Sequence, residues 1–313
     1  MWLNRFTNYL LSHRYQTMAL VFLSTFVPIV GVVGILIAAL VTLRKDVLQG
    51  AILTLLAALP YVISFYVTGK HETAVPIVVW AAVGVAVTSN VLTWVFALMW
   101  RRGTRWAGII QIAALLGVLV VSVVHLIYPE VTDWWSNELQ SYYTQAANVA
   151  ETVASEVAVS PETKQQQLDA INVTRQYATG LMVAAVLLNA ILQLLVARWW
   201  EVVVFAPRTL RRELCSIRLA PLTGVLFVAS LILAYMGNAV VLDIMPILYA
   251  LFCAAGLSIA HYFFGVIRSQ TAWFWVVLFY LIFIFSLPTS VILISVLALF
   301  DIWLDLRKRF TKV

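Results

Sequence analysis

Neutral polar side chains within long apolar stretches are the residues of this chain whose types and spacing could form a binding site. Asn189 and Gln193 are four residues apart, so on a helix they share one face. Asn90 and Gln111 lie in two other apolar stretches. Carboxamides inside a membrane mark either a functional site or hydrogen bonds between helices. These four residues are the candidate lining of a pocket for a small solute, with interhelical bonding as the alternative.

Two aspartates near the end of the chain form a second candidate site. Asp301 and Asp305 are four residues apart and precede the basic run 307–309. Salt bridges to that run are one interpretation, and an ion or proton site is the other. The remaining acid close to an apolar stretch, Asp243, is expected at a turn.

A basic and aromatic segment, 198–221, is the candidate surface for a partner protein. Leu210, Leu214 and Ile217 follow an i, i+4, i+7 pattern, which predicts a short amphipathic helix at the membrane interface. Anchoring of a cytoplasmic loop by positive charge is the alternative to docking of a cytoplasmic protein. The residues assigned to this surface are Arg198, Trp199, Trp200, Arg208, Arg211, Arg212 and Arg218.

The common motifs of membrane enzymes are missing from the sequence. It has no H-E-x-x-H, no P-loop and no G-x-S-x-G elbow. Ser258 and His261 share a helix face, but a triad also needs an acid, and Asp243 is expected at the opposite membrane face. The four histidines show no metal-ligand spacing. We therefore expect no enzymatic activity, no metal and no cofactor.

Long apolar segments supply the elements that must position these residues. Of the 313 residues, 63% are hydrophobic and 11% are charged, which excludes a soluble globular protein, a disordered chain and a nucleic-acid-binding domain. Eight runs reach the roughly 20 residues that a membrane helix needs. None alternates with period two, which favours helices over a barrel. The runs are 17–42, 47–67, 74–100, 106–128, 178–197, 222–242, 245–267 and 272–304.

These runs predict one all-α membrane domain over 1–313, a polytopic helical bundle that crosses the bilayer about eight to ten times. Prolines break the first and the last run, at Pro28 and Pro288. Each broken run either crosses once or folds back on itself.

An acidic segment, 129–177, separates two of the apolar runs. It holds seven acids and two bases. Its centre reads Ser160-Pro161-Glu162, which suits a helix N-cap, a first helical position and a first turn. The segment therefore predicts two helices, about 131–157 and 161–177, that form a hairpin outside the membrane.

The positions of the basic residues predict the orientation. Lys and Arg collect on the cytoplasmic side of bacterial membrane proteins. With the basic loops inside, the acidic hairpin and Lys70 lie outside. If both broken runs fold back, 17 of the 20 Lys and Arg residues are cytoplasmic. The charges thus favour two fold-backs and a cytoplasmic C-terminus in the inner membrane.

Four stretches of the chain resemble the YybS-like family of uncharacterised bacterial membrane proteins. They are Leu43-Arg44-Lys45 after the first run, the acidic hairpin, Ala197-Arg198-Trp199-Trp200 followed by Arg212 to Leu219, and Asp301 to Arg307. That family is distantly similar to the S components of energy-coupling-factor transporters and to the rod-shape protein MreD. S components bind a small substrate and borrow ATPases from separate subunits, which is consistent with the missing P-loop. This chain has more spans and a longer outer hairpin than a typical S component.

Two functions follow as expectations. The first is a transport-related inner-membrane subunit that binds a small solute and works with energising subunits. The alternative is a non-enzymatic scaffold of a cell-envelope assembly, with the hairpin and the basic segment as contact surfaces. Both involve the lipid bilayer and protein partners, both are compatible with a homo-oligomer, and neither involves nucleic acid.

Overall fold

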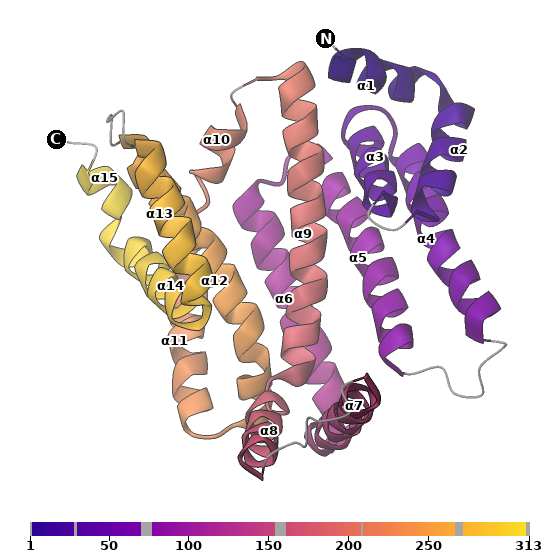
Figure 1. The fold of residues 1–313 in the computed structure, drawn as a ribbon. Helices are drawn as coiled ribbons and strands as arrows, with labels where there is room; N and C mark the ends of the chain where they lie inside the picture. Colours follow the sequence, from indigo (N-terminus) through magenta and orange to yellow (C-terminus); the bar gives the residue numbers. More distant parts are fainter. Residues whose placement is uncertain are drawn as a thin grey trace.

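Helices make up all of the secondary structure in the part of the chain that the structure describes. The computed structural model describes residues 2–27, 30–69, 77–153, 161–207, 209–266 and 272–310 (Figure 1). The predicted all-α class is therefore confirmed. The helices are α1 (Trp2–Ser12), α2 (Arg14–Thr25), α3 (Gly31–Arg44), α4 (Val47–Gly69), α5 (Ile77–Arg101), α6 (Trp106–Ile127), α7 (Val131–Val153), α8 (Pro161–Thr174), α9 (Ala178–Phe205), α10 (Thr209–Leu214), α11 (Pro221–Tyr235), α12 (Ala239–Val266), α13 (Ala272–Phe285), α14 (Leu287–Leu304) and α15 (Leu306–Phe310).

Five of the described helices, α5, α6, α9, α12 and α14, are long and apolar enough to cross a membrane. Shorter apolar segments lie in α3, α4, α11 and α13. Many large apolar side chains on these helices are exposed, including Leu126 on α6 and Phe285 on α13. Exposed apolar side chains in such number need lipid or another protein against them. The chain is thus a multi-pass helical membrane protein.

The first broken run forms a hairpin of two short helices, α2 and α3. Lys45 Nζ, after the end of α3, donates a hydrogen bond to the carbonyl of Leu11, just before α2. Near the tip, a Cβ atom on Gly34 would lie 3.3 Å from the Val21 carbonyl oxygen, so the two helices are closely packed there. At about 1.5 Å per residue, each helix is only about 20 Å long. The run therefore folds back on itself, and Pro28 lies outside the described residues.

The last broken run also turns back, at Ser286. Along α13, Phe279 contacts the ring of Phe264 and Tyr280 OH lies 2.6 Å from His261 Nε2. The beginning of α13 thus lies at the end of α12, and the two helices run antiparallel.

The next helix, α14, runs in the same direction as α12. Ser295 Oγ donates to the carbonyl of Tyr249 at 3.4 Å, and further along, Tyr262 OH donates to the carbonyl of Arg307 at 3.3 Å. Because α13 and α14 run in opposite directions along α12, they form a second hairpin. The turn comes just before Pro288, in the first turn of α14, where its missing N–H leaves no bond unmade.

The two fold-backs bring both ends of the chain to one end of the bundle (Figure 1). We call it the basic end, and the opposite end, beside α7 and α8, the acidic end. Arg208, Arg268 and Lys312, predicted on the basic side, and Lys70, predicted on the other, lie outside the described residues. The described residues of the basic end with positive side chains are Arg5, Arg14, Arg44, Lys45, Arg101, Arg102, Arg105, Arg198, Arg211, Arg212, Arg218, Arg307, Lys308 and Arg309.

The acidic segment contains two helices that contact one another, α7 and α8. Val131 and Ile171 are buried, and Arg175 Nη1 lies 3.2 Å from Asp133 Oδ1. The chain turns after Thr174 to enter α9, so α8 ends three residues before the predicted end. The predicted turn at Ser160 lies outside the described residues.

One predicted boundary is wrong, and it concerns Asp243. The turn between α11 and α12 lies at residues 236–238, not between 242 and 245. Gly237 adopts φ +82° there, a conformation that glycine reaches without strain. Asn238 Oδ1 then accepts a hydrogen bond from Val241 N and caps α12. Asp243 is therefore a buried residue inside a helix and not part of a turn.

Candidate functional site

A buried histidine–aspartate pair joins α6 to α12 near the acidic end. His125 Nε2 lies 2.9 Å from Asp243 Oδ2, although the two residues are 118 positions apart. Their side chains are 8% and 4% exposed. Ionisable residues within membrane helices are rare and mark functional sites. This pair is the candidate functional site of the protein.

A third helix, α9, completes the site through its first turn. The backbone N–H of Gly180 donates to Asp243 Oδ1 at 2.7 Å. Gly180 is the third residue of α9, so its N–H is one of the donors that a helix start leaves unpaired. The positive end of the helix dipole also favours a carboxylate there. Asp243 thus uses one oxygen for α9 and the other for α6.

The absence of a side chain at residue 180 makes this contact geometrically possible. A Cβ atom on Gly180 would lie 1.6 Å from the backbone oxygen of Asp243. Any larger residue would separate α9 from α12. Next to this contact, Thr179 Oγ1 accepts a hydrogen bond from Trp135 Nε1 at 2.9 Å, which fixes α7 to the same turn of α9.

The same three helices, α6, α9 and α12, also line a half-open apolar pocket. Ile247 lines it one turn after Asp243, and Ala184 lines it one turn after Gly180, so the pocket and the pair share one seam. None of the four predicted carboxamides is among its lining residues, which are all apolar. The lining residues are Ile110, Ala113, Ala114, Ala184, Leu187, Leu188, Ile191, Ile247, Ala250, Leu251 and Ala254.

The structure brings two of the four predicted carboxamides, Asn189 and Gln193, together and gives Gln111 a different partner. Gln193 is buried between α5 and α9, where its Oε1 accepts a bond from Thr93 Oγ1 at 2.6 Å. Its amide nitrogen lies 3.5 Å from Asn189 Oδ1, and Asn189 itself is exposed. Gln111 instead donates to Thr223 Oγ1 on α11 at 3.3 Å. Asn90 is buried on α5.

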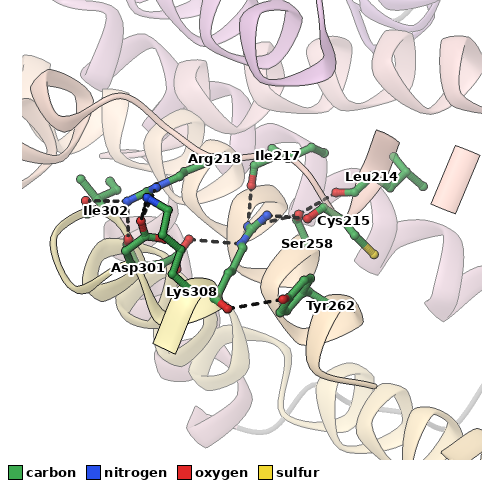
Figure 2. A network of polar contacts seen from close by, with 11 residues as sticks. Leu214, Cys215, Ile217, Arg218, Ser258, Tyr262, Asp301, Ile302 and Lys308 are labelled. Carbon is green, nitrogen blue, oxygen red and sulfur yellow. Dashed lines mark hydrogen bonds and ion pairs between the residues drawn. The ribbon is translucent and has the colours of Figure 1, made fainter. Parts of the chain in front are cut away.

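At the basic end, Asp301 and Asp305 are engaged in ion pairs with the loop after α10 and the tail (Figure 2). Asp301 Oδ2 lies 3.3 Å from Arg307 Nε. Asp305 Oδ2 lies 3.1 Å from Arg218 Nη1 and 2.7 Å from Lys308 Nζ. These contacts are salt bridges of the kind that one of the two interpretations of Asp301 and Asp305 predicts.

Backbone carbonyls after α10 add to this network. Arg307 donates to the carbonyls of Cys215 at 2.5 Å and Ile217 at 2.6 Å. The helix α10 ends at Leu214, so the predicted amphipathic helix through Ile217 is too long. Ile217 is buried in the core instead. The hydrogen bond from Lys308, together with the charge of Arg218, holds the pKa of Asp305 below its ordinary value.

Another buried acid, Glu201, organises the end of α9, and the sequence analysis did not select it. Its carboxylate lies 2.8 Å from Arg44 Nε and 2.6 Å from Arg198 Nη1. Arg198 also pairs with Glu213 at 2.6 Å. The signal that could have identified it is the i, i+3 spacing of Arg198 and Glu201.

The residues predicted to dock a partner therefore fall into two groups. Arg198, Trp200 and Arg218 hold the protein together, because each makes ion pairs or hydrogen bonds within the chain. Trp199, Arg211 and Arg212 are exposed. Arg208 lies outside the described residues.

The fold and the buried His125–Asp243 pair place this chain in the class of multi-pass helical membrane proteins that have an ionisable site between their helices. Within the described residues, no group of three His, Cys, Asp or Glu side chains is arranged to hold a metal ion. No family model, no curated protein and no solved structure matches the chain.

Proposed function

We propose that this protein is a transport-related subunit of the bacterial cytoplasmic membrane that binds a small solute and has no ATPase of its own. The observation that carries the proposal is the buried His125–Asp243 pair. Charged side chains between membrane helices cost free energy and line ion or substrate pathways. The resemblance to the YybS-like family and the missing P-loop are consistent with this role.

The proposed orientation has the basic end in the cytoplasm, together with both termini. Lys and Arg residues favour the cytoplasmic side. The α7–α8 hairpin then lies outside the cell. This orientation requires an even number of complete crossings, since the α2–α3 and α13–α14 hairpins each return to the side on which they begin.

The proposed solute site is the seam of α6, α9 and α12. It combines an apolar pocket with a polar pair, which is the usual composition of a small-molecule site. In this proposal Thr93 and Gln193 form an interhelical hydrogen bond between α5 and α9, which is the alternative interpretation of the carboxamides, and Asn189 is bonded to Gln193 within α9.

The proposed energising partner is a separate ATPase that contacts the exposed residues Trp199, Arg211 and Arg212. The test is capture of C-terminally tagged protein in mild detergent, with the bound proteins identified by mass spectrometry. We expect an ATPase subunit, and we expect Arg211→Glu with Arg212→Glu to abolish its recovery. Arg105→Glu, on a different exposed loop of the basic end, is the matched control and should retain it.

A scaffold of a cell-envelope assembly is the second candidate function. It is favoured by the exposed acids Asp133 of α7 and Asp169 of α8. These two helices lie at the acidic end of the bundle (Figure 1). In this case the same capture recovers envelope proteins and no ATPase. Recovery would then depend on the hairpin and not on Arg211 and Arg212.

A further inference from the structure

We propose that His125 and Asp243 together form a proton-binding site, so that the proton is the coupling ion of this protein. The inference rests on the proposed transport role and names the ion that would drive it. It is argued from the position of each donor and acceptor in the pair, from the burial of the pair and from its isolation from other charges.

The hydrogen bonds decide where a proton can be bound. A carboxylate only accepts hydrogen bonds, so the bond of 2.9 Å to Asp243 Oδ2 requires a hydrogen on His125 Nε2. The other carboxylate oxygen, Oδ1, already accepts the N–H of Gly180. The remaining position is His125 Nδ1, which has no hydrogen-bond partner among the residues that the structure describes.

Proton uptake at Nδ1 is a balanced step. A proton from water forms an N–H bond with Nδ1, and the neutral imidazole becomes an imidazolium. The pair changes from a charge of −1 to zero, and every hydrogen bond described for it is kept. The loaded pair has no net charge, whereas the unloaded pair keeps the negative charge of Asp243, which the Gly180 N–H and the start of α9 stabilise.

No other charge on the three helices compensates the pair. Asp243 is the only acidic or basic residue on α12 apart from its histidine, and α6 holds none besides His125. The charged residues of α9, Arg198 and Glu201, lie at the basic end.

Other titratable groups lie on the elements next to the His125–Asp243 pair. The acidic end contributes the exposed Asp133–Arg175 ion pair of α7 and the α8–α9 turn, and the exposed Glu130 before α7. Tyr177 precedes α9, and Tyr249 follows Asp243 on α12. None of these groups is hydrogen-bonded to the pair.

A solely structural role, in which Asp243 does no more than cap α9, is the competing explanation. A proton site and a structural cap differ in one measurable property. A proton site must change its protonation with pH, and His125 must depend on the charge of Asp243. A structural cap keeps one protonation state throughout the range in which the protein is folded.

The test is the titration of the histidines in full-length protein labelled with ¹⁵N-histidine, in phospholipid nanodiscs, by NMR. The signal of His125 is assigned by its loss in His125→Gln. We expect it to change from the neutral to the charged form as the pH is lowered while the protein stays folded. Asp243→Asn removes the counter-charge and should lower the proton affinity of His125 by at least about tenfold.

Matched variants separate the pair from general effects. Asp133→Asn removes an exposed aspartate at the same end and should leave the proton affinity of His125 unchanged. Asp243→Glu should restore most of the affinity that Asp243→Asn loses.

If Asp243→Asn does not fold, a pH indicator dye is used to compare proton uptake by the wild-type protein and by His125→Gln. The His125→Gln variant should bind one proton fewer. A His125 signal that does not change with pH, or that Asp243→Asn does not shift, would overturn the proposal. The titration uses neither solute nor ATPase, so its failure is distinguishable from failure of the capture experiment.

Discussion

The indole Nε1 of Trp200 donates a hydrogen bond to Thr7 Oγ1 at 2.8 Å, across 193 residues of sequence. The ring of Phe6 also stacks on Trp200, with ring centroids 6.1 Å apart. These contacts dock α1 onto the end of α9. The N-terminal helix is thus part of the packed structure at the basic end, although the sequence analysis assigned no helix to it.

Replacement of Trp200 by phenylalanine tests this docking. The variant keeps the ring but loses the donor, so α1 should be held less firmly by about 1 kcal/mol, the net value of one hydrogen bond. Hydrogen–deuterium exchange of residues 2–12 should become faster. Trp199→Phe is the control, since Trp199 is 52% exposed, and it should leave this exchange unchanged. Equal rates in both variants would contradict the docking.

Gly180→Ala should destabilise the protein more than a glycine substitution elsewhere. The new Cβ would overlap the backbone oxygen of Asp243, so α9 and α12 must separate. The expected loss is about 1–3 kcal/mol, as for other overpacked sites. Thermal unfolding in detergent measures it.

Gly84→Ala is the matched control for that prediction. Position 84 lies on α5 with no atom within 4 Å of the new Cβ, so the change should be neutral or stabilising by about 0.5–1 kcal/mol. An equal loss in the two variants would show that the close contact of α9 with α12 is not the cause.

Asp301→Asn should be more disruptive than Asp305→Asn. Asp301 is 2% exposed, and Asp301→Asn removes a buried charge from its ion pair with Arg307, at a cost of about 3 kcal/mol. Asp305 is more exposed, and its pairs with Arg218 and Lys308 contribute less. Protection of the tail 306–310 from proteolysis, together with thermal unfolding, provides the comparison. A larger loss of stability in Asp305→Asn than in Asp301→Asn would refute the prediction that the buried Asp301–Arg307 pair contributes more.

The contacts of Asp305 should weaken only in acid. Its pKa is below the ordinary value in the folded protein because Lys308 and Arg218 favour the carboxylate. Its contribution is therefore complete above the ordinary aspartate pKa of about 3.9 and is lost as the pH falls through the lower folded value. Deuterium exchange of residues 304–310, corrected for intrinsic rates, should accelerate below about pH 4 in the wild-type protein. Asp305→Asn should show no such acceleration in this range.

Local composition explains which features could be predicted. The class of the fold follows from runs such as 106–128, because apolar side chains remain in lipid whatever their neighbours are. The breaks of the runs 17–42 and 272–304 follow from their prolines. That both runs fold back was favoured by charge, since the alternative would put one terminus with its basic residues on the acidic side.

The candidate sites depend on distant contacts and could be predicted only in part. The salt bridges of Asp301 and Asp305 were one of two open interpretations, because Arg307 and Lys308 follow within a few residues. The third partner, Arg218, is distant in the sequence and was not predicted. The solute site predicted from Asn90, Gln111, Asn189 and Gln193 stays a prediction, and none of the four residues lines the apolar pocket of α6, α9 and α12. A polar residue in a membrane helix can face several neighbours, and the rotation and packing of each helix select one.

The sequence by itself determined that this chain is an all-helical membrane protein. It also predicted that most of the basic residues lie on one side of the membrane. Hydropathy and charge act locally, so each segment carries this information. Only the tertiary structure decided that His125 meets Asp243 and that Gly180 completes the pair. Those contacts require three helices to approach closely at one level, and this depends on the absence of a single side chain at residue 180.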